Sequence, residues 1–195
     1  MVVRVVLSVV VVCVCLCVVV CSAAPFIPYS YPLFLQCDAA RGKDKMGGDA
    51  TVCQQGCAMS CVSMFVNGRN FTLPTGQSSN PGSLNAWLKA NQGYKCIAGN
   101  YNNLVLDAPN RLAPPGHITF VSETEKPEDP LQVLQGLHQG MVYIAHVRNR
   151  SHFVLVLGMD PENPSTLLVN DPYYKTDSYP YAEVSDFIIY QVAGP

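Results

Sequence analysis

Three cysteines stand close together in the stretch from Cys53 to Cys61, with Cys57 between them. The run 57–68 (CAMSCVSMFVNG) has the apolar spacing of a helix and ends at a glycine, so Cys57 is predicted in the first helical turn. A thiol is a useful nucleophile only as the thiolate, and the unpaired backbone N–H groups at a helix N-terminus favour that anion. Gly56 would let a substrate backbone approach closely, whereas Cys61, one turn further on, would face the core. Cys57 is therefore the candidate nucleophile, and its alternative role is one half of a disulfide.

A cysteine nucleophile needs an imidazole that takes up its proton. His152 stands at the start of a β-branched run, directly after a polar turn, where a strand end can present the ring to a cleft. Asp171 ends the next such run, and in a symmetric hairpin it would lie directly opposite His152, on the same face and within reach. A slip of one residue would bring Asn170 there instead. The other histidines are interpreted as surface or sheet residues: His117, His138 and His146.

The elements that would position these residues follow from the hydrophobic pattern. Residues 36–52 carry charges and glycines without helical spacing and are predicted to form a long loop. A second helix is predicted over 83–92 and a third from Asp129-Pro130 to a stop at Gly140. The later β-branched and aromatic runs predict an antiparallel sheet over residues 141–147, 152–159, 165–170 and 187–192. Helices followed by a sheet indicate an α+β fold.

The first residues have the pattern of a secretory signal peptide, predicted over residues 1–24. A basic start at Arg4 precedes an apolar run, and small residues precede Pro25. An uncleaved signal anchor is the alternative, because the run approaches the roughly 20 residues that span a bilayer. Residues 25–195 are predicted to form one domain with a sizeable core.

The charge pattern argues against two classes of partner. The chain has 12 basic and 14 acidic residues, and the basic residues are scattered singly. A nucleic-acid footprint needs a basic patch or stripe, so no nucleic-acid partner is expected, nor docking on a membrane once the signal is removed. The sequence carries no signal for an oligomeric state.

The candidate residues fall into an order that resembles one enzyme family, the C39-like branch of the papain-like cysteine peptidases. The motifs that carry the resemblance are Gln36, Gly56-Cys57, Leu73-Pro74, Leu84-Asn-Ala-Trp87-Leu88, His152 and Val169-Asn-Asp-Pro172. The resemblance implies a papain-like fold, with an N-terminal nucleophile helix packed on a C-terminal antiparallel sheet. It also implies a secreted or endolysosomal hydrolase of peptide or other amide bonds, with a peptide or protein substrate and neither cofactor nor metal.

The resemblance also assigns a role to each residue of the site. Cys57 would attack the acyl carbon, His152 would shuttle the proton, and Asp171 would orient His152. Gln36 and the backbone N–H of Cys57 would form the oxyanion hole. An acyl transferase or deamidase could use the same groups, and a disulfide-stapled binding module could keep the fold without turnover. A zinc site built on Cys53, Cys57, Cys61 and His152 is a further alternative, but it lacks a second compact ligand pair.

The number of cysteines is consistent with one free thiol that could act as the nucleophile. Of nine cysteines, four lie in the predicted signal peptide, and the other five are Cys37, Cys53, Cys57, Cys61 and Cys96. An odd number in an oxidising compartment leaves one thiol over. Pairing Cys37 with Cys53 and Cys61 with Cys96 would leave Cys57 free, although the sequence permits other pairings.

Two Asn-x-Ser/Thr sequons are candidates for N-glycosylation, at Asn70 and at Asn149. Asn149 lies three residues before His152, so a glycan there would crowd a cleft lined by that histidine. Asn70 is therefore expected to be the more fully occupied site.

Overall fold

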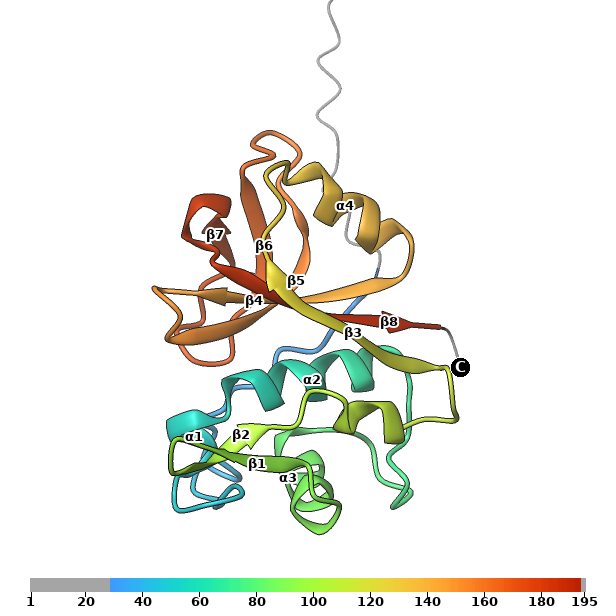
Figure 1. The fold of residues 1–195 in the computed structure, drawn as a ribbon, viewed down its shortest axis with the longest axis vertical. Coiled ribbons are helices and arrows are strands. Elements are labelled where there is room, and N and C mark those ends of the chain that lie inside the picture. Colours follow the sequence, from blue (N-terminus) through green and yellow to red (C-terminus); the bar gives the residue numbers. More distant parts are fainter. Residues whose placement is uncertain (1–28, 194–195) are drawn as a thin grey trace, which may run out of the picture.

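The computed structural model describes residues 29–193 (Figure 1). The predicted signal peptide, residues 1–24, lies outside this range. Within it, the chain has the α+β organisation expected from the sequence, with helices and a six-stranded antiparallel sheet.

The helices are α1 (Val52–Gln55), α2 (Cys57–Gly68), α3 (Pro81–Ala90) and α4 (Leu131–His138). The strands of the large sheet, in spatial order, are β3 (Ile118–Glu125), β8 (Asp186–Val192), β4 (Met141–Val147), β5 (His152–Met159), β6 (Thr166–Asn170) and β7 (Ser178–Pro180). A separate hairpin pairs β1 (Tyr94–Ile97) with β2 (Asn100–Leu104).

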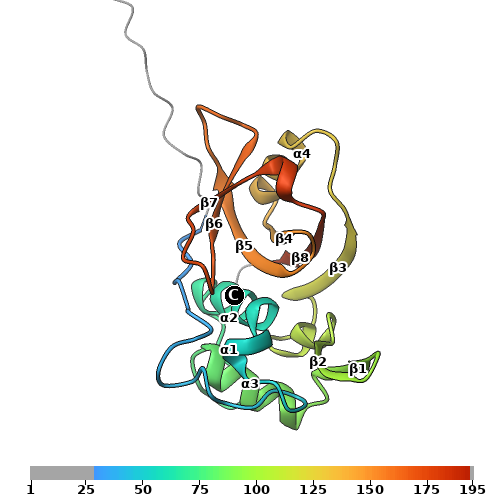
Figure 2. The same cartoon turned by 90° about the vertical axis from the view of Figure 1, so that its left-hand side faces the viewer.

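The sheet is covered on both faces, because its strands alternate between two buried clusters. On β4, Val142 and Ile144 belong to the cluster that α2 and α3 complete, whereas Tyr143 and Ala145 belong to the cluster under α4. Figures 1 and 2 show the result: α2 and α3 lie on one side of the curved sheet and α4 on the other. The nucleophile candidate therefore sits on a helix packed directly against the sheet.

The α2 prediction is confirmed at both ends, from Cys57 to Gly68. The structure gives a packing reason for glycine at position 56, beside the proposed approach of a substrate backbone. Gly56 is buried, and a Cβ atom there would lie 2.5 Å from the backbone oxygen of Val52. Glycine is needed at this position because the single turn of α1 closes directly on α2.

The other two predicted helices are present with shifted bounds. α3 begins at Pro81 because Asn80 caps it, its Oδ1 accepting from the backbone N–H groups of Gly82 and Ser83 at 3.0 Å each. α4 begins one residue after Pro130, where Asp129 Oδ1 accepts from the Leu131 N–H at 2.9 Å.

The β5–β6 register differs from a symmetric hairpin. Such a hairpin would pair Leu155 with Leu168, but the structure pairs Leu155 with Asn170, and the register shifts again between Val156 and Gly158. The prediction that His152 and Asp171 lie directly opposite each other is therefore wrong, because the strand register differs by two residues. Because side chains alternate with a period of two, this even offset keeps Asp171 on the same face, diagonal to His152.

Candidate active site

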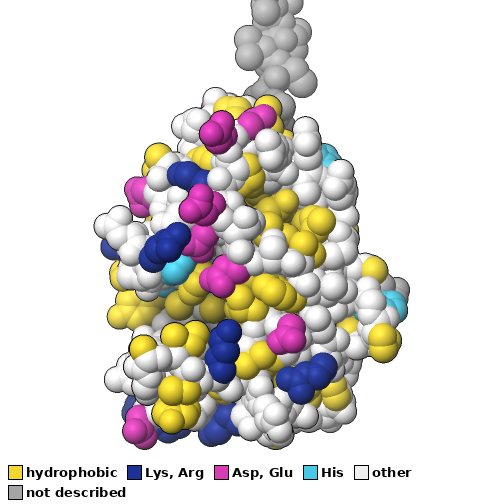
Figure 3. Space-filling view, viewed as in Figure 1, with side chains coloured by type: hydrophobic (Ala, Val, Ile, Leu, Met, Phe, Trp, Pro, Cys, Tyr) yellow, Lys and Arg dark blue, Asp and Glu magenta, His cyan; other side chains and the backbone are white. Residues whose placement is uncertain are grey.

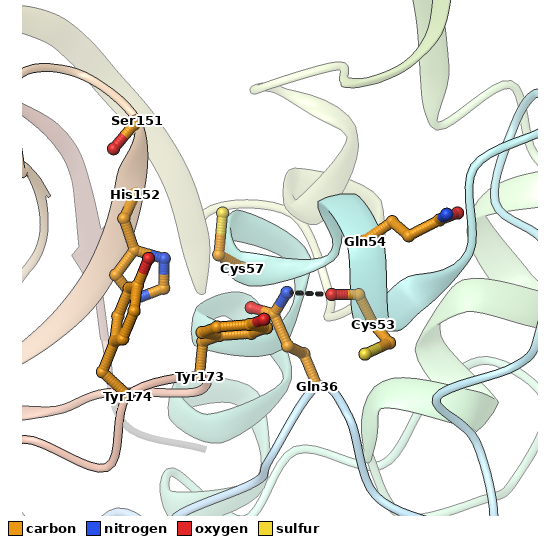
Figure 4. Close-up of a pocket in the computed structure, with 8 residues that line it drawn as sticks. All are labelled: Gln36, Cys53, Gln54, Cys57, Ser151, His152, Tyr173 and Tyr174. Atoms are coloured by element: carbon orange, nitrogen blue, oxygen red, sulfur yellow. Dashed lines mark hydrogen bonds between the residues drawn. The ribbon is translucent and has the colours of Figure 1, made fainter.

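The predicted site residues come together at the junction between α2 and the sheet. Gln36, Cys57 and His152 line one pocket of about 410 Å³ (Figure 4). Asp171 lies behind the ring of His152 and is 1% exposed. The structure therefore gathers all four residues that the sequence had singled out.

Cys57 is the first residue of α2 and is partly exposed to the pocket. No side chain among the described residues caps this helix N-terminus. The first backbone N–H groups of a helix have no intrahelical partner, so the end of α2 can accept an anion. An oxyanion formed beside Cys57 would be stabilised at this position.

Asp171 holds the ring of His152 through the ring nitrogen Nε2. Its Nε2 lies 2.8 Å from Asp171 Oδ1, with both side chains buried. An ionised carboxylate only accepts hydrogen bonds, so Nε2 carries the proton and Nδ1 is the ring nitrogen left for Cys57. Both residues line the same pocket, and the neighbouring Cys57 helps to raise the pKa of His152.

The electrostatics of the pair favour a charged imidazole. Burial by itself lowers the pKa of His152, but the hydrogen bond that His152 donates to Asp171 and the neighbouring Cys57 outweigh this effect and raise the pKa to about 9. Burial would raise the pKa of Asp171, yet its hydrogen bonds from His152 and from the Tyr173 backbone hold it below the ordinary value. The environment thus stabilises an imidazolium beside a carboxylate.

Asp171 is fixed by more than His152. Its Oδ1 also accepts from the backbone N–H groups of Tyr173 and Tyr174, at 2.8 and 2.9 Å. Its Oδ2 accepts from the Tyr179 hydroxyl at 2.7 Å. Four donors leave the carboxylate with a single orientation, and that orientation fixes the ring of His152.

Three tyrosines that donate hydrogen bonds to Asp171 were not predicted from the sequence: Tyr173, Tyr174 and Tyr179. The ring of Tyr174 stands edge-on to His152 with centroids 5.2 Å apart, and Tyr173 lines the same pocket. Tyr179 belongs to β7, a strand of three residues that the pattern did not predict. Only the run Asp171-Pro-Tyr-Tyr174 offered a local signal, because aromatic residues directly after the acid are bound to lie near the histidine.

Gln36 reaches the pocket from the N-terminal segment. Its backbone N–H donates to the Pro172 carbonyl at 2.9 Å, and its side-chain Nε2 donates to the Cys53 carbonyl at 2.8 Å. The side chain is only 3% exposed, and its Oε1 has no partner among the described atoms. An amide nitrogen carries two hydrogens, so one remains for a ligand in the pocket.

A disulfide secures this arrangement. Cys37, next to Gln36, is bonded to Cys53, which lies one helical turn before Cys57. The bridge joins the segment that carries Gln36 to the segment that leads into α2. The predicted Cys37–Cys53 pair is confirmed.

The predicted pairing of Cys61 with Cys96 is wrong. Cys61 is fully buried in α2, where its Sγ approaches the Phe153 carbonyl at 3.7 Å, and Cys96 is exposed on the β1–β2 hairpin. Burial raises the pKa of Cys61 well above the ordinary value. Cys61 is therefore a neutral core thiol, as its place one turn inside the helix predicts, but it is not half of a bridge.

Both candidate glycosylation residues, Asn70 and Asn149, are exposed. Asn70 follows α2, and Asn149 lies at the tip of the turn between β4 and β5 that leads into His152. Their accessibility does not separate the two sequons, so the distinction between them stays a prediction.

No helix among residues 29–193 is long and apolar enough to cross a membrane. Comparisons with protein-family models, with curated protein sequences and with solved structures find no match to this chain.

Proposed function

We propose that this protein is a cysteine hydrolase that cleaves peptide or other amide bonds through an acyl-enzyme intermediate. The observation that carries the proposal is His152, buried between the Cys57 thiol and the four-times hydrogen-bonded carboxylate of Asp171. A purely structural histidine needs no thiol at a helix N-terminus opening into a pocket. Perturbed titratable groups gathered in a cleft are typical of catalytic sites.

The first half of the reaction uses the free nitrogen of His152. The Cys57 thiol gives its proton to Nδ1, and Sγ forms a bond to the carbonyl carbon of the substrate. The negative oxygen that results is stabilised by the backbone N–H of Cys57 and by the free Nε2 hydrogen of Gln36. The C–N bond then breaks as Nδ1–H of His152 passes its proton to the leaving amine.

The second half regenerates the thiol. Water gives a proton to Nδ1 of His152 and attacks the thioester carbon, and the C–S bond breaks as the carboxylic acid leaves. Cys57 recovers its proton from His152. Asp171 stays ionised throughout and keeps the ring oriented.

The fold and the compartment fit this chemistry. A nucleophile helix packed on an antiparallel sheet, with the cleft at their junction, is similar to the papain-like arrangement that the sequence motifs imply. The Cys37–Cys53 disulfide and the predicted signal peptide favour secretion or an endolysosomal lumen.

Hydrolysis of a fluorogenic peptide library by the secreted protein tests the proposal. We expect turnover that is abolished by Cys57→Ala and by His152→Ala, with folding checked by circular dichroism. Cys96→Ala is the matched control, because Cys96 is the exposed free thiol outside the pocket. Loss of activity in Cys96→Ala alone, or equal activity in all variants, would refute it.

A further inference from the structure

The cleft extends to a second side of Cys57. A neighbouring cavity of about 330 Å³ shares Gln54, Cys57 and Ser151 with the first pocket. Its walls come from β2, through Asn103, and from the sheet, through His146 and Phe153. In Figure 3 hydrophobic side chains lie along the junction between the helical and sheet halves, acidic side chains gather mostly on the sheet side, and basic side chains lie on both sides.

The position of His152 assigns the two cavities to the two sides of the scissile bond. His152 lines the first pocket and does not line the second. The leaving amine must lie next to the histidine that protonates it. The first pocket therefore receives the leaving group, and the acyl part of the substrate extends into the second.

The second cavity has a cation at its rim. Arg150 lines it and donates from Nε to Asp186 Oδ2 at 3.2 Å, while His146 Nδ1 lies 3.1 Å from the other carboxylate oxygen. The Arg150 side chain is 62% exposed, whereas the Asp186 side chain is 9% exposed. An approaching ligand meets the guanidinium, because the carboxylate is covered by its two partners.

The turn that carries Arg150 is built with unusual backbone geometry. Arg148, Asn149 and Arg150 have φ values of 55°, 55° and 62°, in the left-handed region that residues other than glycine seldom adopt. Ser151 Oγ closes the turn by donating to the Arg148 carbonyl at 2.7 Å. Strained backbone of this kind is concentrated at functional sites.

This geometry sends the two arginines to opposite sides of the cleft. The Arg148 guanidinium lies over the Tyr174 ring, 4.0 Å from its centroid, beside the first pocket. Arg150 points to the second cavity. No Asp or Glu of the described chain lines either cavity, and Asp186, which pairs with Arg150, has a side chain that is only 9% exposed.

We propose that the second cavity is the acyl-side subsite and that Arg150 makes the enzyme select peptides with an Asp or Glu side chain there. Asp186 and His146 position the guanidinium, whose terminal nitrogens then pair with the substrate carboxylate. This inference rests on the proposed hydrolase function and deepens it by naming the substrate class.

Matched peptides test the selection. Glu and its isostere Gln are placed in turn at each of the three positions before the scissile bond, and kcat/KM is measured for wild type and variants. At one position we expect wild type to prefer Glu over Gln by about fivefold or more, as one charge-assisted contact would give. Arg150→Gln should bring that ratio close to one, and Arg150→Lys should keep part of it.

Arg111→Gln is the control. Arg111→Gln removes the same charge, but Arg111 lies over Trp87, outside both cavities. The preference of this variant for the Glu peptide should therefore equal that of wild type. A wild-type ratio near one at all three positions, or a preference unchanged in Arg150→Gln, would overturn the proposal.

Failure of the proposed function would look different, because wild type would cleave neither peptide. Binding of the Glu and Gln peptides to Cys57→Ala, measured by calorimetry, then decides the subsite by itself. Tighter binding of the Glu peptide that disappears with Arg150→Gln supports it, and equal binding of both peptides overturns it.

Discussion

His152 Nε2 and Asp171 Oδ1 lie 2.8 Å apart inside the protein, and this contact decides which nitrogen of His152 faces Cys57. It also raises the pKa of His152 to about 9, together with the Cys57 neighbour and against the effect of burial. The consequences can be tested one residue at a time.

Asp171→Asn should move the alkaline limb of the pH–rate profile. In the wild type, the imidazolium persists until the pH rises through about 9, so kcat/KM should fall in that range. The amide keeps the shape of the carboxylate but not its charge, so the pKa of His152 falls and the limb moves to lower pH. A limb at the same pH in wild type and variant would show that Asp171 does not stabilise the imidazolium.

The same pair contributes to the pH dependence of folding. The pKa of His152 in the folded protein lies above its ordinary value of 6.5. The contribution of the pair to the free energy of unfolding is therefore fully present below about pH 6.5. It is lost as the pH rises through about 9. Asp171→Asn should flatten that part of the stability curve, measured by urea unfolding between pH 6 and 10.

Gln36→Ala should lower kcat by about 10²- to 10³-fold, the usual cost of one oxyanion donor. KM should change little, because the hydrogen bond strengthens only when the oxygen becomes charged. Gln132→Ala is the control, since Gln132 is exposed on α4, across the sheet from the site. Full turnover in Gln36→Ala would remove Gln36 from the oxyanion hole.

The double variant Cys37→Ser/Cys53→Ser should also lower kcat. Without the bridge, the segment carrying Gln36 is no longer tied to the entry of α2, and about 3 kcal/mol of unfolding free energy should be lost with the closed loop. If the bridge acts through Gln36, adding Gln36→Ala to the double variant should cost much less than in wild type. Full additivity of the two effects in kcat would mean that the bridge does not act through Gln36.

Cys61→Ala should leave kcat unchanged and cost about 1 kcal/mol of unfolding free energy, the order of a small buried cavity. A larger loss, of about 2 to 5 kcal/mol, would be expected only if Cys61 formed a disulfide, and it does not. Loss of activity in Cys61→Ala at unchanged stability, together with an active Cys57→Ala, would mean that the nucleophile was assigned to the wrong cysteine.

The sequence predicts those parts of the fold whose hydrophobic pattern is strong. α2, β4 and β5 have clear periodicity and end where turn residues begin, so their bounds agree with the structure. β2 (NYNNL) and the charged end of β3 (ITFVSETE) lack that pattern, and they form strands because β1 and β8 pair with them. Pairing partners are supplied by the tertiary fold, so local patterns could not reveal these strands.

The site was predictable for a different reason. Cys57 and His152 stand at the first residue of a helix and of a strand, where side chains can face a cleft. The contact with Asp171 was expected from a wrong register, and it forms because the two-residue offset preserves the face. Arg150 acts through a contact with Asp186 in a distant segment, which spacing alone does not specify. Tyr179 lies only eight residues after Asp171, but its short strand β7 has no hydrophobic pattern that would predict it.

The central claim is that Cys57 is a thiol activated by His152, and competitive labelling with an electrophilic cysteine probe tests it most directly. Among residues 29–193 three thiols are free: Cys57 in the pocket, Cys61 in the core and Cys96 on the surface. Peptide mapping over time should show Cys57 labelled much faster than Cys96, with Cys61 unlabelled in the folded protein. In the His152→Ala variant, the labelling rate of Cys57 should fall to that of Cys96. If Cys57 reacts no faster than Cys96 in the wild type, or equally fast without His152, the thiol is not activated and the proposed catalytic site is wrong.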